Sequence, residues 1–221
     1  VTERQLEVAI GLTLIAAGIV GLWLAISGGP FLIALGALTM VAALAYTGGP
    51  WPYGYKALGE VFVFIFFGLV AVIGTAYLQA RVFDPLFLAA SLPVGSLVTA
   101  ILVVNNLRDI PTDTAAGKRT LAVVIGKSAT RGEYLALLVV AYLVPVVLGV
   151  VSAAAGLVVG GVAVLLPLLT LPLARPLLAT VRGFTEPRQL NLVLKGTARL
   201  ALWHGVLFGA GLAIAGALAA R

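Results

Sequence analysis

Seven long apolar runs, separated by polar or glycine- and proline-rich connections, dominate this sequence of 221 residues. The runs cover residues 6–26, 31–47, 57–79, 85–107, 134–151, 156–178 and 200–220. A transmembrane α-helix needs about 20 predominantly apolar residues, whereas a membrane β-strand shows about 10 residues of alternating polarity, a pattern that is not visible in these runs. The sequence therefore predicts an all-α fold, a polytopic transmembrane bundle of seven helices that forms one domain over residues 1–221.

The composition excludes several classes of protein. Hydrophobic residues make up 62% of the chain and charged residues 10%, whereas soluble domains are about 45–50% apolar and about 25% charged. This excludes a cytosolic globular enzyme and a disordered chain, and the absence of cysteine excludes a disulfide scaffold. A net charge of +6 would suggest nucleic acid in a soluble protein. Here we expect membrane lipid around the chain, no nucleic-acid partner, and a topological role for the charge.

The basic residues are divided unequally between the two ends of the predicted helices. If successive runs cross the membrane in alternate directions, twelve of the 14 Lys and Arg residues lie on the N-terminal side, and only Arg81 and Arg221 lie on the other. Ten of the twelve fall in two long loops, which include residues 108–131 and 175–199. Because cytoplasmic loops are enriched in basic residues, we expect a multi-pass protein of the cell (plasma or inner) membrane. Its two long loops are then cytoplasmic and its C-terminus lies outside.

One of these loops, residues 105–133, contains the densest polar cluster. Asn105, Asp109 and Asp113 follow one another at intervals of four residues, so a helix would place them on one face. Such oxygen ligands suit Mg²⁺, which binds through one or two carboxylates together with substrate phosphates. Lys118 and Arg119 are suited to the far side of a diphosphate. The alternative is a solvated loop whose charges cap helices and fix the topology.

A second polar segment precedes the third apolar run. It contains Tyr46, Tyr53, Tyr55 and Lys56, and Glu60 follows it. An interfacial belt of aromatic side chains with a snorkelling lysine would explain most of this segment. Glu60 does not fit that explanation, because a carboxylate that enters an apolar helix usually faces the bundle interior or a partner. Tyr46, Tyr53, Lys56 and Glu60 are therefore candidate substrate-binding residues.

Two stretches of the sequence resemble a known family. The run from Asn105 to Gly126, with the pattern Asn-Asn-x-Arg-Asp-x-x-x-Asp-x-x-x-Gly-Lys-Arg-Thr-Leu-Ala-Val, resembles the second aspartate-rich motif of the UbiA-type intramembrane prenyltransferases. The stretch from Tyr46 to Gly68 is similar to the 1,4-dihydroxy-2-naphthoate polyprenyltransferase branch of that family, which acts in menaquinone biosynthesis. The resemblance covers essentially the whole chain.

The resemblance implies a larger protein than these seven helices. Members of the family have nine transmembrane helices and two aspartate-rich motifs, one after the second helix and one after the sixth. The pattern of the first motif, Asn-Asp-x-x-Asp-x-x-x-Asp, does not occur in this sequence. We therefore expect the first two helices and the first motif in an N-terminal remainder of the same protein, and we expect this polypeptide alone to be inactive.

The resemblance also assigns roles to residues. It implies that Asp109 and Asp113 are the catalytic carboxylates that hold Mg²⁺ against a polyprenyl diphosphate, while Asn105 is a further candidate ligand on spacing alone. It implies that Arg108, Lys118 and Arg119 contact the diphosphate. The expected reaction is transfer of the polyprenyl chain to 1,4-dihydroxy-2-naphthoate with decarboxylation, giving demethylmenaquinone.

Two alternatives stay open at this stage. The first is another prenyltransferase of the same type, with 4-hydroxybenzoate, haem or a chlorophyllide as acceptor. The second is a membrane transporter without enzymatic activity, which would carry ionisable residues near the bilayer midplane or broken helices in symmetric positions. In this sequence the ionisable residues gather at the expected cytoplasmic ends of the helices, which favours chemistry on a diphosphate.

Overall fold

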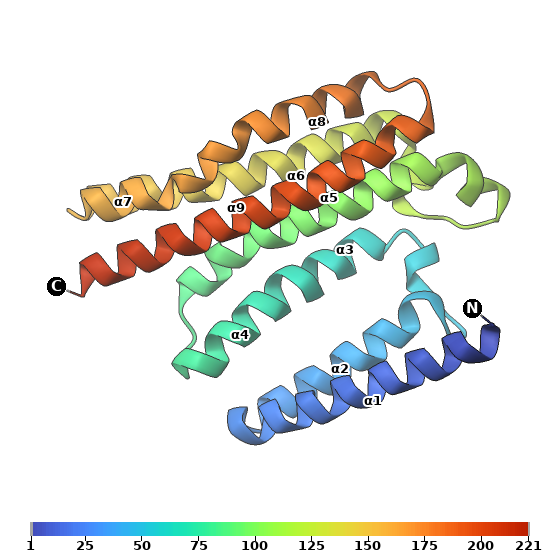
Figure 1. Ribbon diagram of the computed structural model, residues 1–221, viewed down its shortest axis with the longest axis horizontal. Helices are drawn as coiled ribbons and strands as arrows, with labels where there is room; N and C mark the ends of the chain where they lie inside the picture. Colours follow the sequence, from blue (N-terminus) through green and yellow to red (C-terminus); the bar gives the residue numbers. More distant parts are fainter. Residues whose placement is uncertain (1, 221) are drawn as a thin grey trace.

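The computed structural model describes residues 2–220, and nearly all of this range is helical. Seven helical spans are long and apolar enough to cross a membrane, which confirms the predicted all-α fold and the predicted number of spans (Figure 1). The spans are Glu3–Gly28 (α1), Pro30–Thr47 (α2), Gly59–Ala80, Pro85–Ala115 (α5), Leu121–Ala154 (α6), Val158–Gly183 and Pro187–Ala219. The last span consists of a 3₁₀ turn, Pro187–Gln189 (η4), and the helix α9, Leu190–Ala219.

α6 is kinked at Gly126, whose φ of 78° and ψ of 168° are not helical, and two other spans contain a π-helical or 3₁₀ segment between two α-helices. The third contains α3 (Gly59–Val63), the π-helical segment η2 (Phe64–Val70) and α4 (Ala71–Ala80). The sixth contains α7 (Val158–Val164), the 3₁₀ segment η3 (Leu166–Thr170) and α8 (Leu171–Gly183). Pro167 and Pro172 lie in the first turns of η3 and α8. Because proline has no N–H to donate, it is tolerated in a first turn but interrupts a helix that would run through it.

The helices pack around α5. α5, α6 and α9 lie side by side, and the span from α3 to α4 packs along α5 (Figure 1). The hairpin of α1 and α2 lies at the outer side of the bundle. Half of the apolar window of α5 is buried, against 6% of the window of α1. Side chains of α1 such as Ile19 and Trp23 are exposed, as expected of a helix that faces lipid. The helices packed around α5 therefore fix the positions of its side chains.

The two segments that the sequence analysis describes as long loops are mostly helical in the structure. α5 continues to Ala115 and α6 begins at Leu121, so only five residues of the segment 105–133 connect the two helices. In the same way, α8 continues to Gly183 and α9 begins at Leu190. Apolar runs end where side chains become polar, but a helix that leaves the bilayer keeps its backbone hydrogen bonds in water until a cap ends it.

The end of α5 shows such a cap. Gly117 has a φ of 71°, in the left-handed region that favours glycine. The N–H of Lys118 donates to the carbonyl of Asp113 at 2.9 Å, and the N–H of Gly117 donates to that of Thr114 at 3.1 Å. This pair of bonds is the Schellman arrangement, and it satisfies carbonyls that the last helical turn leaves free. The chain therefore turns sharply directly after the aspartate-rich segment.

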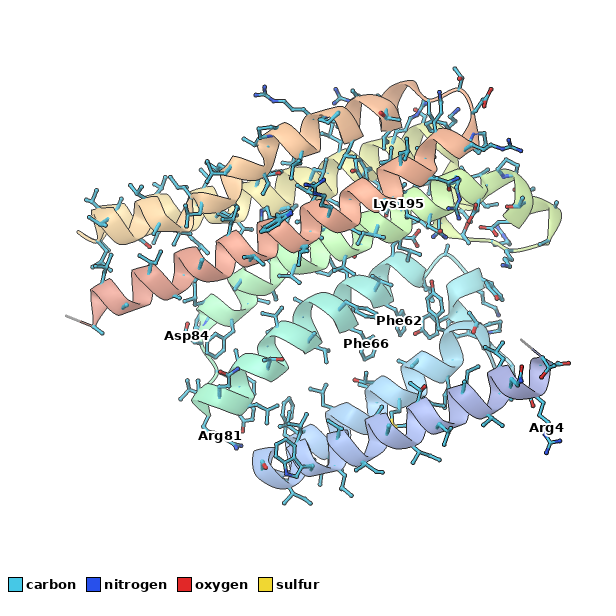
Figure 2. All side chains as sticks on the ribbon, viewed as in Figure 1. Arg4, Phe62, Phe66, Arg81, Asp84 and Lys195 are labelled. Atoms are coloured by element: carbon cyan, nitrogen blue, oxygen red, sulfur yellow. The ribbon has the colours of Figure 1, made fainter. Side chains whose placement is uncertain are left out.

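The bundle has two distinct ends. The N-terminus and the connections after α2, α5 and α8 lie at one end, and the connections after α1, α4 and α6 lie at the other (Figure 1). Figure 2 places Arg4 at the first end and Arg81 and Asp84 at the second. At this second end, Arg81 donates a hydrogen bond to the carbonyl of Ser27 and so ties α4 to the end of α1. The first end is the one that the sequence analysis assigns to the cytoplasm.

Candidate active site at the polar end of α5

The aspartate-rich segment lies on the last turns of α5. Asn105, Asp109 and Asp113 are four residues apart in one continuous helix, so they lie on one face with roughly 6 Å between successive Cβ atoms. Pro111 lies among them and does not end the helix. All three side chains are partly buried. The common face that the spacing predicts is therefore present.

Arg108 connects the first part of this face to α9. Its guanidinium donates to Oδ1 and Oδ2 of Asp109, each at 2.7 Å, and to Oδ1 of Asn105 at 2.9 Å. It also donates to Oδ1 of Asn191, in the first turn of α9, at 3.0 Å. An arginine fork that binds both oxygens of a carboxylate fixes the orientation of that carboxylate and balances its charge. Asp109 is thus held in place by a basic residue that the resemblance assigns to the diphosphate.

The turn after α5 returns a second basic residue to the face. Nζ of Lys118 lies 3.8 Å from Oδ1 of Asp113 and 4.8 Å from the centre of the Tyr55 ring. Such a cation–π contact contributes about 0.5–1 kcal/mol at an exposed site. Lys118 is therefore shared between the aspartate-rich face and the aromatic segment that precedes α3.

The backbone joins these two segments directly. The N–H of Arg119 donates to the carbonyl of Tyr55 at 3.1 Å, and Lys56 and Arg119 form an isolated parallel β-bridge. A concavity of about 590 Å³ lies here, lined in part by Lys56, Ala57 and Arg119. The side chain of Lys56 is exposed, with Nζ 5.0 Å above the ring of Trp51. The two polar segments of the sequence analysis are therefore neighbours at the first end of the bundle.

An aromatic cavity lies beside the second segment, between α2 and the span of α3 and η2. Its volume is about 470 Å³, and its lining includes Tyr46, Tyr53, Phe62 and Phe66. Phe62 and Phe66 extend from that span toward α2 (Figure 2). The rings of Tyr53 and Phe62 are stacked with their centres 4.0 Å apart, and Tyr46 meets Tyr53 edge-on at 5.4 Å. Such a cavity fits a flat apolar ring.

Two features of the backbone shape this cavity. Oη of Tyr53 donates to the carbonyl of Ala42 at 2.6 Å, which holds the buried Tyr53 ring against α2. The π-helical segment η2 begins at Phe64, between Phe62 and Phe66 of the wall. π-helical turns are rare and occur frequently at functional sites. The hydroxyl of Tyr53 is therefore engaged in a hydrogen bond that holds the fold, while its ring forms part of the cavity wall.

Glu60 is buried, and its partner is a residue that the sequence analysis did not select. Nδ2 of Asn106 donates to Oε1 of Glu60 at 2.7 Å. The exposed fraction is 4% for Glu60 and 6% for Asn106. Glu133, the last residue of the segment 105–133, was also missed, although its Oε2 is buried without a hydrogen-bond partner in the described part of the chain. The signal for Glu133 was available, because this carboxylate directly precedes the apolar run 134–151.

The oxygen atoms of the α5 face fit a magnesium ion that binds together with substrate. Among residues 2–220, no group of three or more His, Cys, Asp or Glu side chains is arranged to hold a metal ion. Two carboxylates and one amide, one helical turn apart, match the one or two carboxylates with which Mg²⁺ is usually held while water and substrate phosphates complete its shell. The donor set is compatible with Mg²⁺, and the metal role of Asp109, Asp113 and Asn105 stays a prediction.

Comparison with known proteins gives consistent matches. Residues 5–183 match the model of the UbiA prenyltransferase family. The chain is 43% identical to the 1,4-dihydroxy-2-naphthoate octaprenyltransferase of Mycobacterium tuberculosis over 99% of this chain and 70% of that protein. It is 31% identical to the protein of the same name from Bacillus subtilis, over 89% of this chain and 61% of that protein. The UbiA prenyltransferase domain-containing protein 1 of Gallus gallus is 35% identical over 80% of this chain and 50% of that protein.

Proposed function

The chain belongs to the UbiA prenyltransferase family, and on that premise we propose that it transfers a polyprenyl chain from a polyprenyl diphosphate to 1,4-dihydroxy-2-naphthoate. The carboxylate is lost in this reaction, which gives demethylmenaquinone for menaquinone biosynthesis. The names of the bacterial relatives support the naphthoate as acceptor. Because the chain spans 61–70% of these two relatives, the proposed activity is that of the whole protein.

One observation carries the proposal: the polar end of α5 collects carboxylates and basic side chains at the mouth of an apolar bundle. Asp109 and Asp113 lie on one face, with Arg108 and Lys118 in contact with them. A polyprenyl diphosphate has a charged head and a long apolar tail, so it needs a site at the boundary between a polar surface and a membrane interior. This end of α5 supplies such a boundary.

The basic residues have a direct role in the proposed reaction. Arg108, Lys118 and Arg119 bind the diphosphate oxygens and offset the negative charge that grows on them as the allylic C–O bond breaks. Asp109, Asp113 and Asn105 hold Mg²⁺, which when bound withdraws electron density from the leaving diphosphate. The carboxylates therefore attract the cation, and the neighbouring arginine orients Asp109.

The aromatic cavity is the proposed place of the acceptor ring. Tyr46, Tyr53 and Phe62 offer flat apolar surfaces to a naphthalene ring system. The apolar surroundings exclude water, which would otherwise capture the allylic cation before the ring carbon attacks it. We also propose that the first end of the bundle, with the aspartate-rich face, lies in the cytoplasm, since twelve basic residues belong to that side.

The test uses the full-length protein in detergent with 1,4-dihydroxy-2-naphthoate, a polyprenyl diphosphate and Mg²⁺. Product formation is compared with and without EDTA, and in Asp109→Asn and Asp113→Asn variants. Asp84→Asn is the matched control, because Asp84 caps the opposite end of the same helix and asparagine is an equally good N-cap.

We expect the first two variants to lose about 100-fold or more of the turnover rate, while the Asp84 variant stays near the parent and EDTA stops the reaction. Consumption of 4-hydroxybenzoate in place of the naphthoate would assign the chain to a sister branch of the family. Variants of Asp109 and Asp113 as active as the parent would show that these carboxylates only set topology.

A further inference from the structure

A buried carboxylate in this bundle has one oxygen without a partner. Glu60 is 4% exposed, and its Oε1 accepts the hydrogen bond of 2.7 Å from Asn106. Its Oε2 is buried and has no hydrogen-bond partner among residues 2–220. A buried carboxylate oxygen without a partner is costly, by about 1–3 kcal/mol or more for a charged group. Native proteins rarely keep such a group unless it has a use.

Other polar groups in the neighbourhood of Glu60 come from different helices. Glu133, on α6, also has a buried oxygen without a partner, and its carboxyl group is close enough to Glu60 for their charges to interact. The hydroxyl of Tyr46, at the end of α2, lies 3.5 Å from the position that a Cβ on Gly59 would occupy. Polar side chains from α2, α5 and α6 thus lie in the neighbourhood of Glu60 on α3.

The position of Glu60 relates it to both parts of the proposed active site. Its partner Asn106 follows Asn105 on α5 and precedes Asp109 by three residues, which is about one helical turn. On the other side, Tyr46 and Phe62 belong to the wall of the aromatic cavity. Glu60 is therefore joined through Asn106 to the helix that carries the place proposed for the diphosphate, and it precedes Phe62 of the cavity wall by two residues.

We propose that Oε2 of Glu60 accepts a hydrogen bond from a ring hydroxyl of the aromatic acceptor, while Asn106 holds Oε1 and fixes the carboxylate. This inference rests on the proposed function and assigns part of its acceptor specificity. The matching ligand is a hydroxylated aromatic ring, because a carboxylate can only accept hydrogen bonds and a ring hydroxyl can donate one. Since two carboxylates repel each other, the acid group of the acceptor points away from Glu60.

The contact also has a chemical consequence. A hydroxyl that donates to a carboxylate gains electron density on its oxygen, and the ring to which it is attached becomes more electron-rich. The ring carbon then attacks the allylic cation more readily. Glu60 is on this account a binding residue for the acceptor, and Asn106 is a positioning residue that acts through it.

The experiment measures acceptor binding without turnover. The full-length protein in detergent is titrated calorimetrically, in the absence of prenyl diphosphate, with 1,4-dihydroxy-2-naphthoate and with 2-naphthoate, which has no ring hydroxyl. The variants are Glu60→Gln and, as a control with the same atomic change at an exposed carboxylate, Glu7→Gln. The affinity for a polyprenyl diphosphate and the thermal unfolding temperature are measured for each variant as checks of folding.

We expect the parent and Glu7→Gln to bind the dihydroxy compound roughly 10- to 100-fold more tightly than 2-naphthoate. Glu60→Gln is expected to lose most of this preference and to keep its affinity for the prenyl diphosphate. An unchanged preference in Glu60→Gln would overturn the inference. If Glu60→Gln does not fold, Glu60→Asp, whose carboxylate is withdrawn by one CH₂ group, decides the question: a folded variant that loses most of the preference for the hydroxylated ring supports the inference, and one that keeps the full preference of the parent overturns it.

Turnover distinguishes this inference from the proposed function. A parent protein that prefers the hydroxylated ring but transfers no prenyl chain to it would contradict the proposed reaction and leave the hydroxyl site of Glu60 standing. A parent that transfers the chain, with a preference that does not depend on Glu60, would contradict only the hydroxyl site.

Discussion

Arg108 binds both oxygens of its neighbour Asp109, through Nε and Nη2, at 2.7 Å each. The same guanidinium also reaches Asn105 on α5 and Asn191 on α9. Arg108 therefore joins the aspartate-rich face of α5 to the first turn of α9. It balances the charge of Asp109 and fixes the direction in which this carboxylate points.

This arrangement predicts the effect of Arg108→Lys. Lysine keeps the positive charge but lacks the planar fork, so the orientation of Asp109 is lost. Loss of such a supporting contact usually costs 10- to 100-fold in metal affinity. We expect the Mg²⁺ concentration for half-maximal prenyl transfer to rise by roughly this factor. Arg188→Lys, at an exposed arginine in η4, is the control. Equal Mg²⁺ dependence in all three proteins would show that Arg108 does not support a metal ligand.

Gly68 predicts a second effect, on stability. A Cβ at Gly68 would lie 2.5 Å from the Cα of Gly95, so η2 and α5 meet with their backbones nearly in contact. Gly68→Ala must push the two helices apart, and overpacking of this kind costs typically 1–3 kcal/mol. Gly74→Ala on the same span is the control, because its Cβ would meet only ordinary van der Waals distances.

We expect a lower unfolding temperature in detergent for Gly68→Ala than for the parent and Gly74→Ala. The shift of the helices also separates Glu60 on α3 from Asn106 on α5, so acceptor binding should weaken in the same variant. Equal unfolding temperatures for the two alanine variants would mean that the seam between η2 and α5 is not tightly packed.

Tyr53 predicts how stability depends on pH. Burial raises the pKa of Tyr53 above its usual value of 10.0. A group whose pKa is raised in the folded state binds its proton more tightly there than in the unfolded state. Its contribution to the free energy of unfolding is therefore complete below the pKa of the unfolded state, and it is lost as the pH rises through the pKa of the folded state. We expect the free energy of unfolding to fall as the pH increases above about 10.

Tyr53→Phe separates the two roles of this side chain. The variant loses the hydrogen bond to the carbonyl of Ala42, at a cost of about 1 kcal/mol at neutral pH. It also loses the titrating hydroxyl, so its stability should fall less steeply in alkali. Thermal unfolding followed by circular dichroism between pH 7 and pH 11 gives both quantities; an equally steep decline in parent and variant would assign the pH effect to other groups.

Substitution of Gly117 is expected to strain the backbone locally. Alanine at its φ of 71° costs about 1–2 kcal/mol, and the turn that it closes carries Lys118 back to Asp113. Gly117→Ala should lower both the unfolding temperature and the affinity for prenyl diphosphate. Gly132→Ala, in an open position on α6, should leave the affinity unchanged. A Gly117 variant with the affinity and stability of the parent would show that the turn adapts without strain.

Local patterns explain why part of the site was predictable. The common face of Asn105, Asp109 and Asp113 follows from helix periodicity, provided that the helix continues past the apolar run. The helix ends were not predictable from hydropathy, since a helix that leaves the membrane stops at a cap and not at the first polar residue. Gly117 was visible in the sequence as a glycine, but its role as the cap depends on a backbone conformation that only the structure shows.

The sequence by itself determined the class of the protein, the number and order of its apolar spans, and the separation of its basic residues between two ends. These properties are local, because a run of about 20 apolar residues crosses a bilayer whatever its neighbours are. Only the tertiary structure decided that Asn106 donates a hydrogen bond to Glu60, which precedes it by 46 residues, and that Tyr55 lies beside Arg119. Such pairs depend on which faces of distant helices pack together, and that choice is made by the fit of the whole bundle.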